Sequence, residues 1–244
     1  MRIMRGSAAA ASHQPPRPSY SESNRHLTIA RGLSVARQTG VRTHRRTTCQ
    51  ELQQAGAALG PACDAIHNQS LLQYDVLPIG DVARTSLLIP PLLALTYELL
   101  GGVLTAVARR IAPGGAAAPL IDDQRLRTVA AVAATCAVIK LSAVLIAAET
   151  PYAFFVLAAA ALVQWATLDG TYASLLLGTV VAVAGPLAEI PFEELGCWQY
   201  YSPDYFPFGQ DLPGISSLTG PCYFAVTQDA QALGRLFDDD ERDV

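Results

Sequence analysis

The sequence is poor in charge and in the residues that form catalytic or metal-binding motifs. Only 16% of its 244 residues are charged and 51% are hydrophobic, a high apolar content for a soluble protein of this length. After residue 50 the only histidine is His67, so the most common general base is missing from the apolar part of the chain. No HExxH, GxSxG, Walker or Gly-rich dinucleotide motif is present.

The five cysteines add no cofactor site. They show neither CxxC spacing nor a paired framework, which argues against a zinc site and against a disulfide scaffold. We therefore expect no metal ligands, no cofactor and no catalytic residues, and we expect that the protein is not an enzyme.

Acidic residues are almost absent from the first segment. Residues 1–50 contain nine arginines, six serines and five threonines, but a single acid, Glu22. This composition is typical of an organellar transit peptide, and the hydroxyl content favours the plastid. The alternative is a disordered basic segment that touches anionic lipid or nucleic acid. Residues 51–84 are mixed in composition and moderately polar, and Pro61 and Pro78 argue against a long helix. We therefore expect a linker that is partly disordered.

Long apolar blocks begin at Thr85. A helix needs about 20 apolar residues to cross the hydrocarbon core of a bilayer. Five blocks approach or reach this length, at residues 85–107, 128–148, 152–168, 171–190 and 212–237. The last is weaker because Gln228, Asp229 and Gln231 interrupt it. The sequence thus predicts an all-α, polytopic transmembrane helix bundle of about five spans over residues 85–237, followed by an acidic tail, residues 238–244.

The arginines predict how the bundle is oriented. Arg109, Arg110, Arg125 and Arg127 all fall between the first and second blocks, and the positive-inside rule places this loop on the cytosolic or stromal side. "WQYYSPDYF", Trp198 to Phe206, then falls on the opposite side. It shows no strand-like alternation, and its Trp and Tyr side chains suit a turn at the membrane interface.

Ionisable residues inside the blocks are costly and should face the interior of the bundle. A lysine at the centre of a span costs about 2.5–3.5 kcal/mol on insertion scales. Lys140 lies within the second block, Glu98 within the first and Asp229 within the last. We expect Lys140 either to pair with one of these carboxylates or to contact a ligand.

Several short stretches, in this order, resemble the insulin-induced gene (Insig) family of lipid-sensing membrane proteins. "WQYYSPDYF" is similar to the family's YQYTSPDF signature, and the remaining matches follow the same order along the chain. They are "LIPPLLAL" at 88–95, Lys140, "VQWATLDG" at 163–170, "LTGPCYF" at 218–224 and "ALGRLF" at 232–237. The resemblance covers residues 85–237 and agrees with the orientation that the arginines predict.

The resemblance implies a bundle that binds a sterol or diacyl lipid and regulates a partner membrane protein by association. Animal members have six spans, whereas residues 51–83 are too polar for a first one, and a Gly- and Ala-rich loop, Pro113 to Pro119, is added. The acid matching Asp169 grips the family's escort protein; here Gly170 replaces the arginine that follows it. A helix cap is the alternative role of Asp169.

We accordingly expect a lipid cleft and a separate partner surface. The candidate ligand-binding residues are Lys140, Trp165, Trp198, Tyr200 and Tyr201. Asp169 is the candidate partner-binding residue. We expect a membrane lipid or sterol and a partner membrane protein to bind, no nucleic acid, and we leave a homo-oligomer open. We expect the membrane to be a plastid membrane, with the endoplasmic reticulum as the alternative. A plastid membrane scaffold or assembly factor without lipid sensing is the alternative function.

Overall fold

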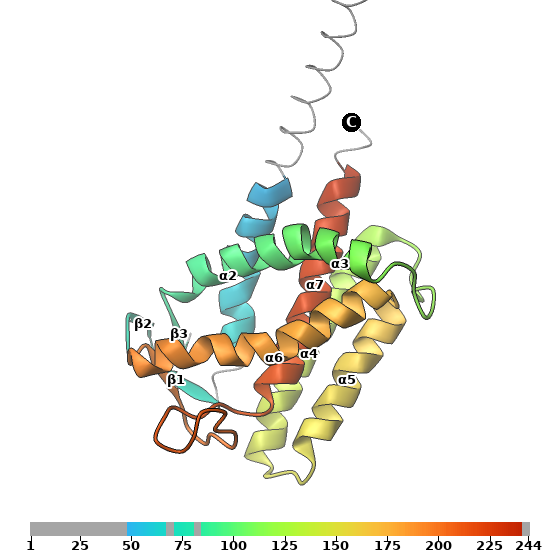
Figure 1. Ribbon diagram of the computed structural model, residues 1–244. Coiled ribbons are helices and arrows are strands. Elements are labelled where there is room, and N and C mark those ends of the chain that lie inside the picture. The colour runs from blue at the N-terminus through green and yellow to red at the C-terminus, as the bar shows by residue number, and fades with distance from the viewer. Residues whose placement is uncertain (1–47, 67–70, 81–83, 241–244) are drawn as a thin grey trace, which may run out of the picture. The chain divides into compact units, whose positions relative to one another are not determined.

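Helices make up most of the computed structural model, which describes residues 48–66, 71–80 and 84–240. The expected transit segment, apart from its last three residues, and the last four residues of the acidic tail lie outside these ranges. A helix at 48–66 is followed by the elements labelled in Figure 1. They are α2 (Ile89–Glu98), η1 (Leu99–Leu104), α3 (Thr105–Ile111), α4 (Gln124–Ala147), α5 (Ala153–Leu168), α6 (Tyr172–Glu194) and α7 (Thr219–Asp240).

The expected helical membrane bundle is confirmed. Three of the helical segments, Ile89–Ile111, α4 and α6, are long and apolar enough to cross a membrane, and α5 is a shorter apolar helix of 16 residues. The first of these segments runs through α2, η1 and α3 without a break. These segments and α5 correspond to the first four apolar blocks of the sequence.

Helix α7 lies at the centre of the bundle and contacts α4, α5, α6 and η1. In the view of Figure 1, α2 and α6 cross α7, while α4 and α5 run beside it. Nearly every α7 residue from Thr219 to Gly234 is buried, including the polar Thr227, Gln228 and Gln231. The weak hydropathy of this last block therefore reflects its central place, because a helix surrounded by other helices does not face lipid.

Hydrogen bonds between helices satisfy many of the polar side chains in the interior. Gln164 of α5 donates to the Thr135 hydroxyl of α4 (2.9 Å), and Ser174 of α6 donates to the Gln228 side chain of α7. The Tyr97 hydroxyl of α2 donates to Asp229 of α7 (3.2 Å). In lipid such bonds contribute to helix association, with measured values averaging about 0.6 kcal/mol.

Residues 48–66 form a packed helix, so the expectation of a linker across this stretch is wrong. Its buried residues recur at helical spacing and include Leu52, Gly56, Gly60 and Cys63. Gln53 and Gln54, on the other face, are exposed. A Cβ atom at Gly56 would lie 2.4 Å from the Leu93 carbonyl oxygen, and one at Gly60 would lie 2.3 Å from the Leu93 side chain. The GxxxG spacing lets this helix approach α2 closely.

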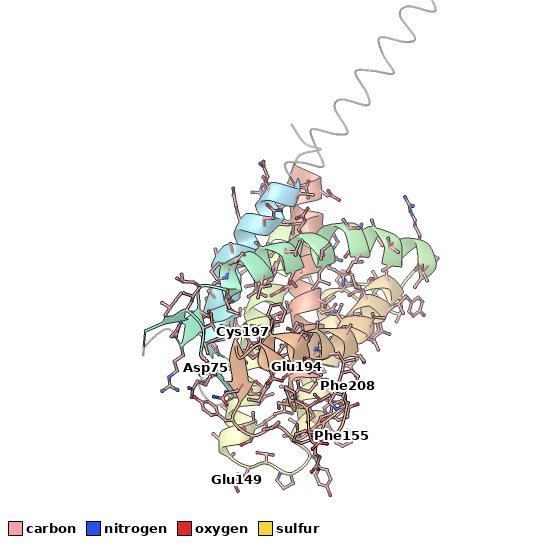
Figure 2. The ribbon with its side chains drawn as sticks, turned by 60° about the vertical axis from the view of Figure 1, so that its left-hand side comes forward. Asp75, Glu149, Phe155, Glu194, Cys197 and Phe208 are labelled. Carbon is pink, nitrogen blue, oxygen red and sulfur yellow. The ribbon has the colours of Figure 1, made fainter. Side chains whose placement is uncertain are left out.

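Two short strand pairs lie beside the helices. β1 (Leu72–Tyr74) pairs antiparallel with β4 (Trp198–Tyr200), and β2 (Pro78–Ile79) pairs antiparallel with β3 (Thr85–Ser86). Beyond the first pair, the Asp75 N–H donates to the Cys197 carbonyl (3.1 Å), and the two residues lie near each other in Figure 2.

The first three residues of the Trp198–Phe206 stretch, Trp198–Tyr200, therefore form a strand, so the stretch is not a turn over its whole length. Trp198 and Tyr200 point into the protein and Gln199 points out, an alternation that was not recognised in the sequence. A three-residue strand is too short for periodicity alone to reveal.

Candidate functional site

A cavity of about 340 Å³ opens between the helix at 48–66, α2, α4, α6 and α7. One part of its wall is apolar and comes from Leu92, Leu93 and Leu100 on one side and Val181 and Val226 on the other. These residues belong to helices that are far apart in the chain, so the cavity exists only when the bundle is assembled.

Polar groups line the part of the cavity near β1 and β4. The Glu189 carboxylate accepts hydrogen bonds from the hydroxyls of Tyr200 (2.5 Å) and Tyr223 (2.7 Å). The Asp64 carboxylate accepts from the hydroxyls of Tyr74 (2.8 Å) and Thr85. Both acids line the cavity. Its wall thus combines a hydrocarbon-like surface with two carboxylates held in place by hydroxyl donors.

The strand pair fixes the aromatic side chains at this polar end. Trp198 is 5% exposed, lines the cavity and stacks on Phe192 with ring centroids 5.0 Å apart. Tyr74 meets the same indole edge to face at 5.8 Å. Burial, then the adjacent Glu189 carboxylate, raise the pKa of the Tyr200 phenol well above its usual range, so Tyr200 remains a hydrogen-bond donor.

The candidate ligand residues are divided by the structure. Trp198 lines the cavity, and Tyr200 reaches it through Glu189. Tyr201 is 57% exposed, as an interfacial side chain would be. The Trp165 indole donates to the Thr171 carbonyl (2.9 Å), at the turn between α5 and α6. Trp165, Tyr201 and Lys140 do not line this cavity.

Lys140 does not face the interior of the bundle, which corrects the expectation from the sequence. Its side chain lies on an exposed face of α4, seven residues before the helix ends. A long lysine side chain at that depth can extend toward the membrane surface instead of inward. Asp229 is fully buried and bonded to Tyr97, and Glu98 accepts from Gln53 (2.6 Å).

The cavity residues that the sequence reasoning missed are Asp64, Tyr74, Glu189 and Tyr223. Asp64 and Tyr74 fall in the segment expected to be a linker. Glu189 was not among the candidate residues. An acid a few residues before the end of an apolar helix was the available signal, but only the fold shows which way it points.

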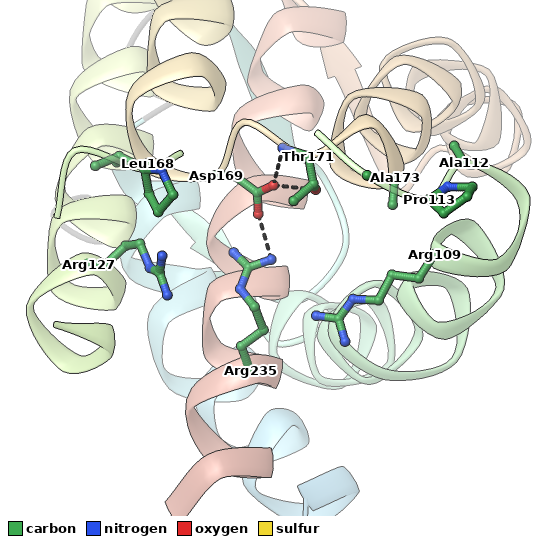
Figure 3. Close-up of a pocket in the computed structure, with 11 residues that line it drawn as sticks. Arg109, Ala112, Pro113, Arg127, Leu168, Asp169, Thr171, Ala173 and Arg235 are labelled. Atoms are coloured by element: carbon green, nitrogen blue, oxygen red, sulfur yellow. Dashed lines mark hydrogen bonds and ion pairs between the residues drawn. The ribbon is translucent and has the colours of Figure 1, made fainter. Parts of the chain in front are cut away.

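Asp169 is a buried structural residue of the α5–α6 turn. It accepts from the N–H (2.9 Å) and the hydroxyl of Thr171, which in turn caps α6 by accepting from the Ser174 N–H. Its other carboxylate oxygen lies 2.5 Å from the Arg235 guanidinium of α7 (Figure 3). A capping role by way of Thr171 is thus present, and Asp169 is buried, with 6% of its surface exposed.

The added loop between α3 and α4 lies across this turn. The Ala116 N–H donates to the Gly170 carbonyl (2.8 Å), and the Tyr172 N–H donates to the Gly114 carbonyl (3.1 Å). Gly170 has φ +69°, and a Cβ there would lie 2.4 Å from the Ala117 carbonyl oxygen. An arginine does not fit at this position, which explains why glycine replaces it.

These features define a class: a polytopic helical membrane protein whose bundle encloses an amphipathic cavity. Comparison with solved structures then gives the fold. The chain is similar to the Insig homologue MvINS of Mycobacterium vanbaalenii, with TM-score 0.57 and 22% identity. A cross-linked MvINS trimer gives TM-score 0.58 and 25% identity. Both alignments cover 78% of this chain and 94% of MvINS.

The resemblance to the Insig family seen in the sequence motifs is thereby confirmed, and the fold is Insig-like. No protein-family model and no curated protein matches the chain. An integral membrane protein with a regulatory or lipid-associated role is the function class that this fold supports.

Proposed function

We propose that this protein binds a neutral membrane lipid, a sterol or a diacyl lipid, in the central cavity and regulates a partner membrane protein by association. The observation behind this proposal is the cavity itself: about 340 Å³, apolar along one wall and lined by Asp64 and Glu189 at the strand end. A lipid with an apolar body and an uncharged hydroxyl head matches both parts.

The polar end favours a hydroxyl head over an anionic one. Carboxylates accept hydrogen bonds from hydroxyl groups but repel phosphate and other anions. Glu189 has two hydroxyl donors already and a carboxylate has about four acceptor positions, so it can accept from a ligand as well. The apolar wall then holds the hydrocarbon, as ligand pockets in proteins commonly do.

The mechanism that we propose is recognition and not catalysis. A filled cavity stabilises one arrangement of the surrounding helices, and a partner that binds this arrangement associates more tightly when lipid is present. Asp169 acts indirectly in this scheme, by holding the Thr171 turn and Arg235. The alternative function, a membrane scaffold that needs no lipid, uses the same outer helix faces for protein contacts alone.

Mass spectrometry of lipids retained after gentle detergent extraction tests the proposal. The wild-type protein should retain about one sterol or diacyl lipid per chain. Val181→Trp should abolish this retention, because Val181 lines the cavity and the indole fills it. Val180→Trp is the matched control, since Val180 is the neighbouring residue, has the same side chain and is exposed.

Glu189→Gln tests the polar end in the same assay. It should change which lipid is retained while Glu194→Gln, an exposed acid in the same helix, leaves the lipid profile unchanged. A wild-type protein that is monodisperse and carries no stoichiometric lipid would favour the scaffold function. Equal loss of lipid in Val181→Trp and Val180→Trp would show that retention does not depend on this cavity.

We propose that the protein resides in a plastid membrane, with the endoplasmic reticulum as the alternative location. The nine arginines and single acid of residues 1–50 support an organellar address. A fluorescent reporter fused to this segment should accumulate in plastids, and staining of the reticulum with an uncleaved N-terminus would favour the alternative. A homo-oligomer, as in the cross-linked MvINS trimer, can be tested by light scattering of the purified protein.

A further inference from the structure

A second cavity, of about 420 Å³, lies at the other end of α6 from the strands and is lined by arginines from three helices. Arg109 comes from α3, Arg127 from α4 and Arg235 from α7. Figure 3 shows the three side chains around one hollow, roofed by the α3–α4 loop and bordered by the α5–α6 turn. Arg110 and Arg125, from the same basic stretch, do not line it.

The charges in this arginine pocket do not balance. Three guanidinium groups face one carboxylate, Asp169, and that carboxylate is already paired with Arg235. Among the described residues, neither Arg109 nor Arg127 forms an ion pair. The Nε atom of Arg127 is buried and has no hydrogen-bond acceptor, although another nitrogen of the same group donates to Gln124. Arg127 is half-buried and Arg109 is exposed, so the pocket presents two positive charges that no carboxylate of its lining neutralises, which favours an anion as its ligand.

The chemistry of the pocket selects the anion. The guanidinium fork matches the oxygens of a phosphate group and donates to two of them at once. The pocket also lies in the basic end of the bundle, which the positive-inside rule places at the cytosolic or stromal membrane surface. A lipid phosphate at that surface is within reach, whereas its acyl chains remain in the bilayer outside the pocket.

We propose that the arginine pocket binds a phosphate group, carried by an anionic phospholipid headgroup or present as free phosphate. Arg109 and Arg127 supply the unmatched charge. Asp169 holds Arg235 in position as the third wall, and the loop that carries Pro113 and Pro119 closes the site. This site is separate from the central cavity and uses the opposite charge preference.

Native mass spectrometry with two lipid probes and one soluble probe tests the proposal. Dioleoyl phosphatidic acid should bind the wild-type protein at least tenfold more tightly than dioleoyl phosphatidylcholine. The double variant Arg109→Gln/Arg127→Gln should lose at least tenfold in affinity for phosphatidic acid. Arg110→Gln/Arg125→Gln, which removes the same charge from the same stretch outside the pocket, should change it less than twofold.

Inorganic phosphate distinguishes the two sources of the anion. If millimolar phosphate displaces phosphatidic acid from the wild-type protein and raises its melting temperature, but does neither in the pocket variant, the site takes free phosphate. If it does neither in the wild-type protein while phosphatidic acid binds as expected, the site takes a lipid headgroup.

Two results would overturn the proposal. One is equal affinity of the wild-type protein for the two lipids together with no effect of phosphate. The other is an equal loss in the two double variants, which would indicate general surface attraction. If the pocket variant does not fold, Arg127→Lys keeps the charge, removes the fork and should still lower affinity about threefold. Val181→Trp should leave this binding intact, which separates it from the central cavity.

Discussion

Helices α6 and α7 pack against each other, yet they place their polar residues in opposite ways. α6 exposes apolar side chains such as Val180 and Val183, while α7 buries Thr227, Gln228 and Asp229. In water, buried helices are apolar and exposed faces are polar. In a bilayer the exposed face contacts hydrocarbon, so hydropathy along the sequence reports contact with lipid and the polar residues gather at the centre.

Among the variants that test this comparison, Gly234→Ala has the largest expected effect on stability. A Cβ at Gly234 would lie 2.2 Å from the Gly101 carbonyl oxygen, where α7 crosses η1, and backbone on the other side cannot move away cheaply. We expect the free energy of unfolding in mixed micelles to fall by about 3 kcal/mol. Gly102→Ala is the control, because its Cβ would meet only the Leu52 side chain, at 3.8 Å. Equal stability of the two variants would contradict a close crossing.

An intermediate effect is expected from Asp229→Ala. This change removes the acceptor of the Tyr97 hydroxyl at the centre of the bundle, and an unsatisfied buried donor costs about 1–3 kcal/mol. Tyr97→Phe and the double variant complete a thermodynamic cycle for the pair. We expect a coupling energy of about 0.6 kcal/mol, and no coupling would mean that Asp229 is buried for another reason.

The smallest effect is expected from Val180→Leu, on the exposed face of α6. One apolar side chain replaces another in contact with lipid, so stability should change by less than about 0.5 kcal/mol. Ala225→Leu, at a fully buried position of α7, should instead cost about 1–3 kcal/mol through overpacking. Similar changes in stability for the two variants would show that α7 is not tightly packed at the centre of the bundle.

The comparison also explains what could be predicted from the sequence. The first four apolar blocks and the motifs around Trp198 and Asp169 were sufficient for a helical membrane bundle of Insig type. The helix at 48–66 was missed because it buries a stripe of small residues, Gly56 and Gly60 among them, and small residues give little hydropathy signal. Pro61 also argued against a helix, yet the helix continues through it.

The site was harder to predict than the fold. Trp198, a candidate ligand-binding residue, lines the central cavity, whereas Lys140, expected to face the interior, lies on an exposed face of its helix. A charged side chain in an apolar block can either pair with another group inside the bundle or extend to the membrane surface. The sequence alone does not indicate which of the two occurs. Glu189 and Asp64 both line the cavity but come from different helices, α6 and the helix at 48–66, and no local sequence pattern reveals that they share one wall.

The π-helical segment η1 acts as a phase shift within one continuous helix. A π turn contains one residue more than an α turn, so everything after it is rotated by about 100° relative to an unbroken α-helix. Before the shift, Leu92 and Leu93 face the central cavity; after it, Arg109 faces the arginine pocket. A single-residue deletion at Gly102 would restore the α-helical phase and turn Arg109 away by about a quarter turn. The extra residue thus sets the orientation of the helix so that a single span lines two cavities of different chemistry.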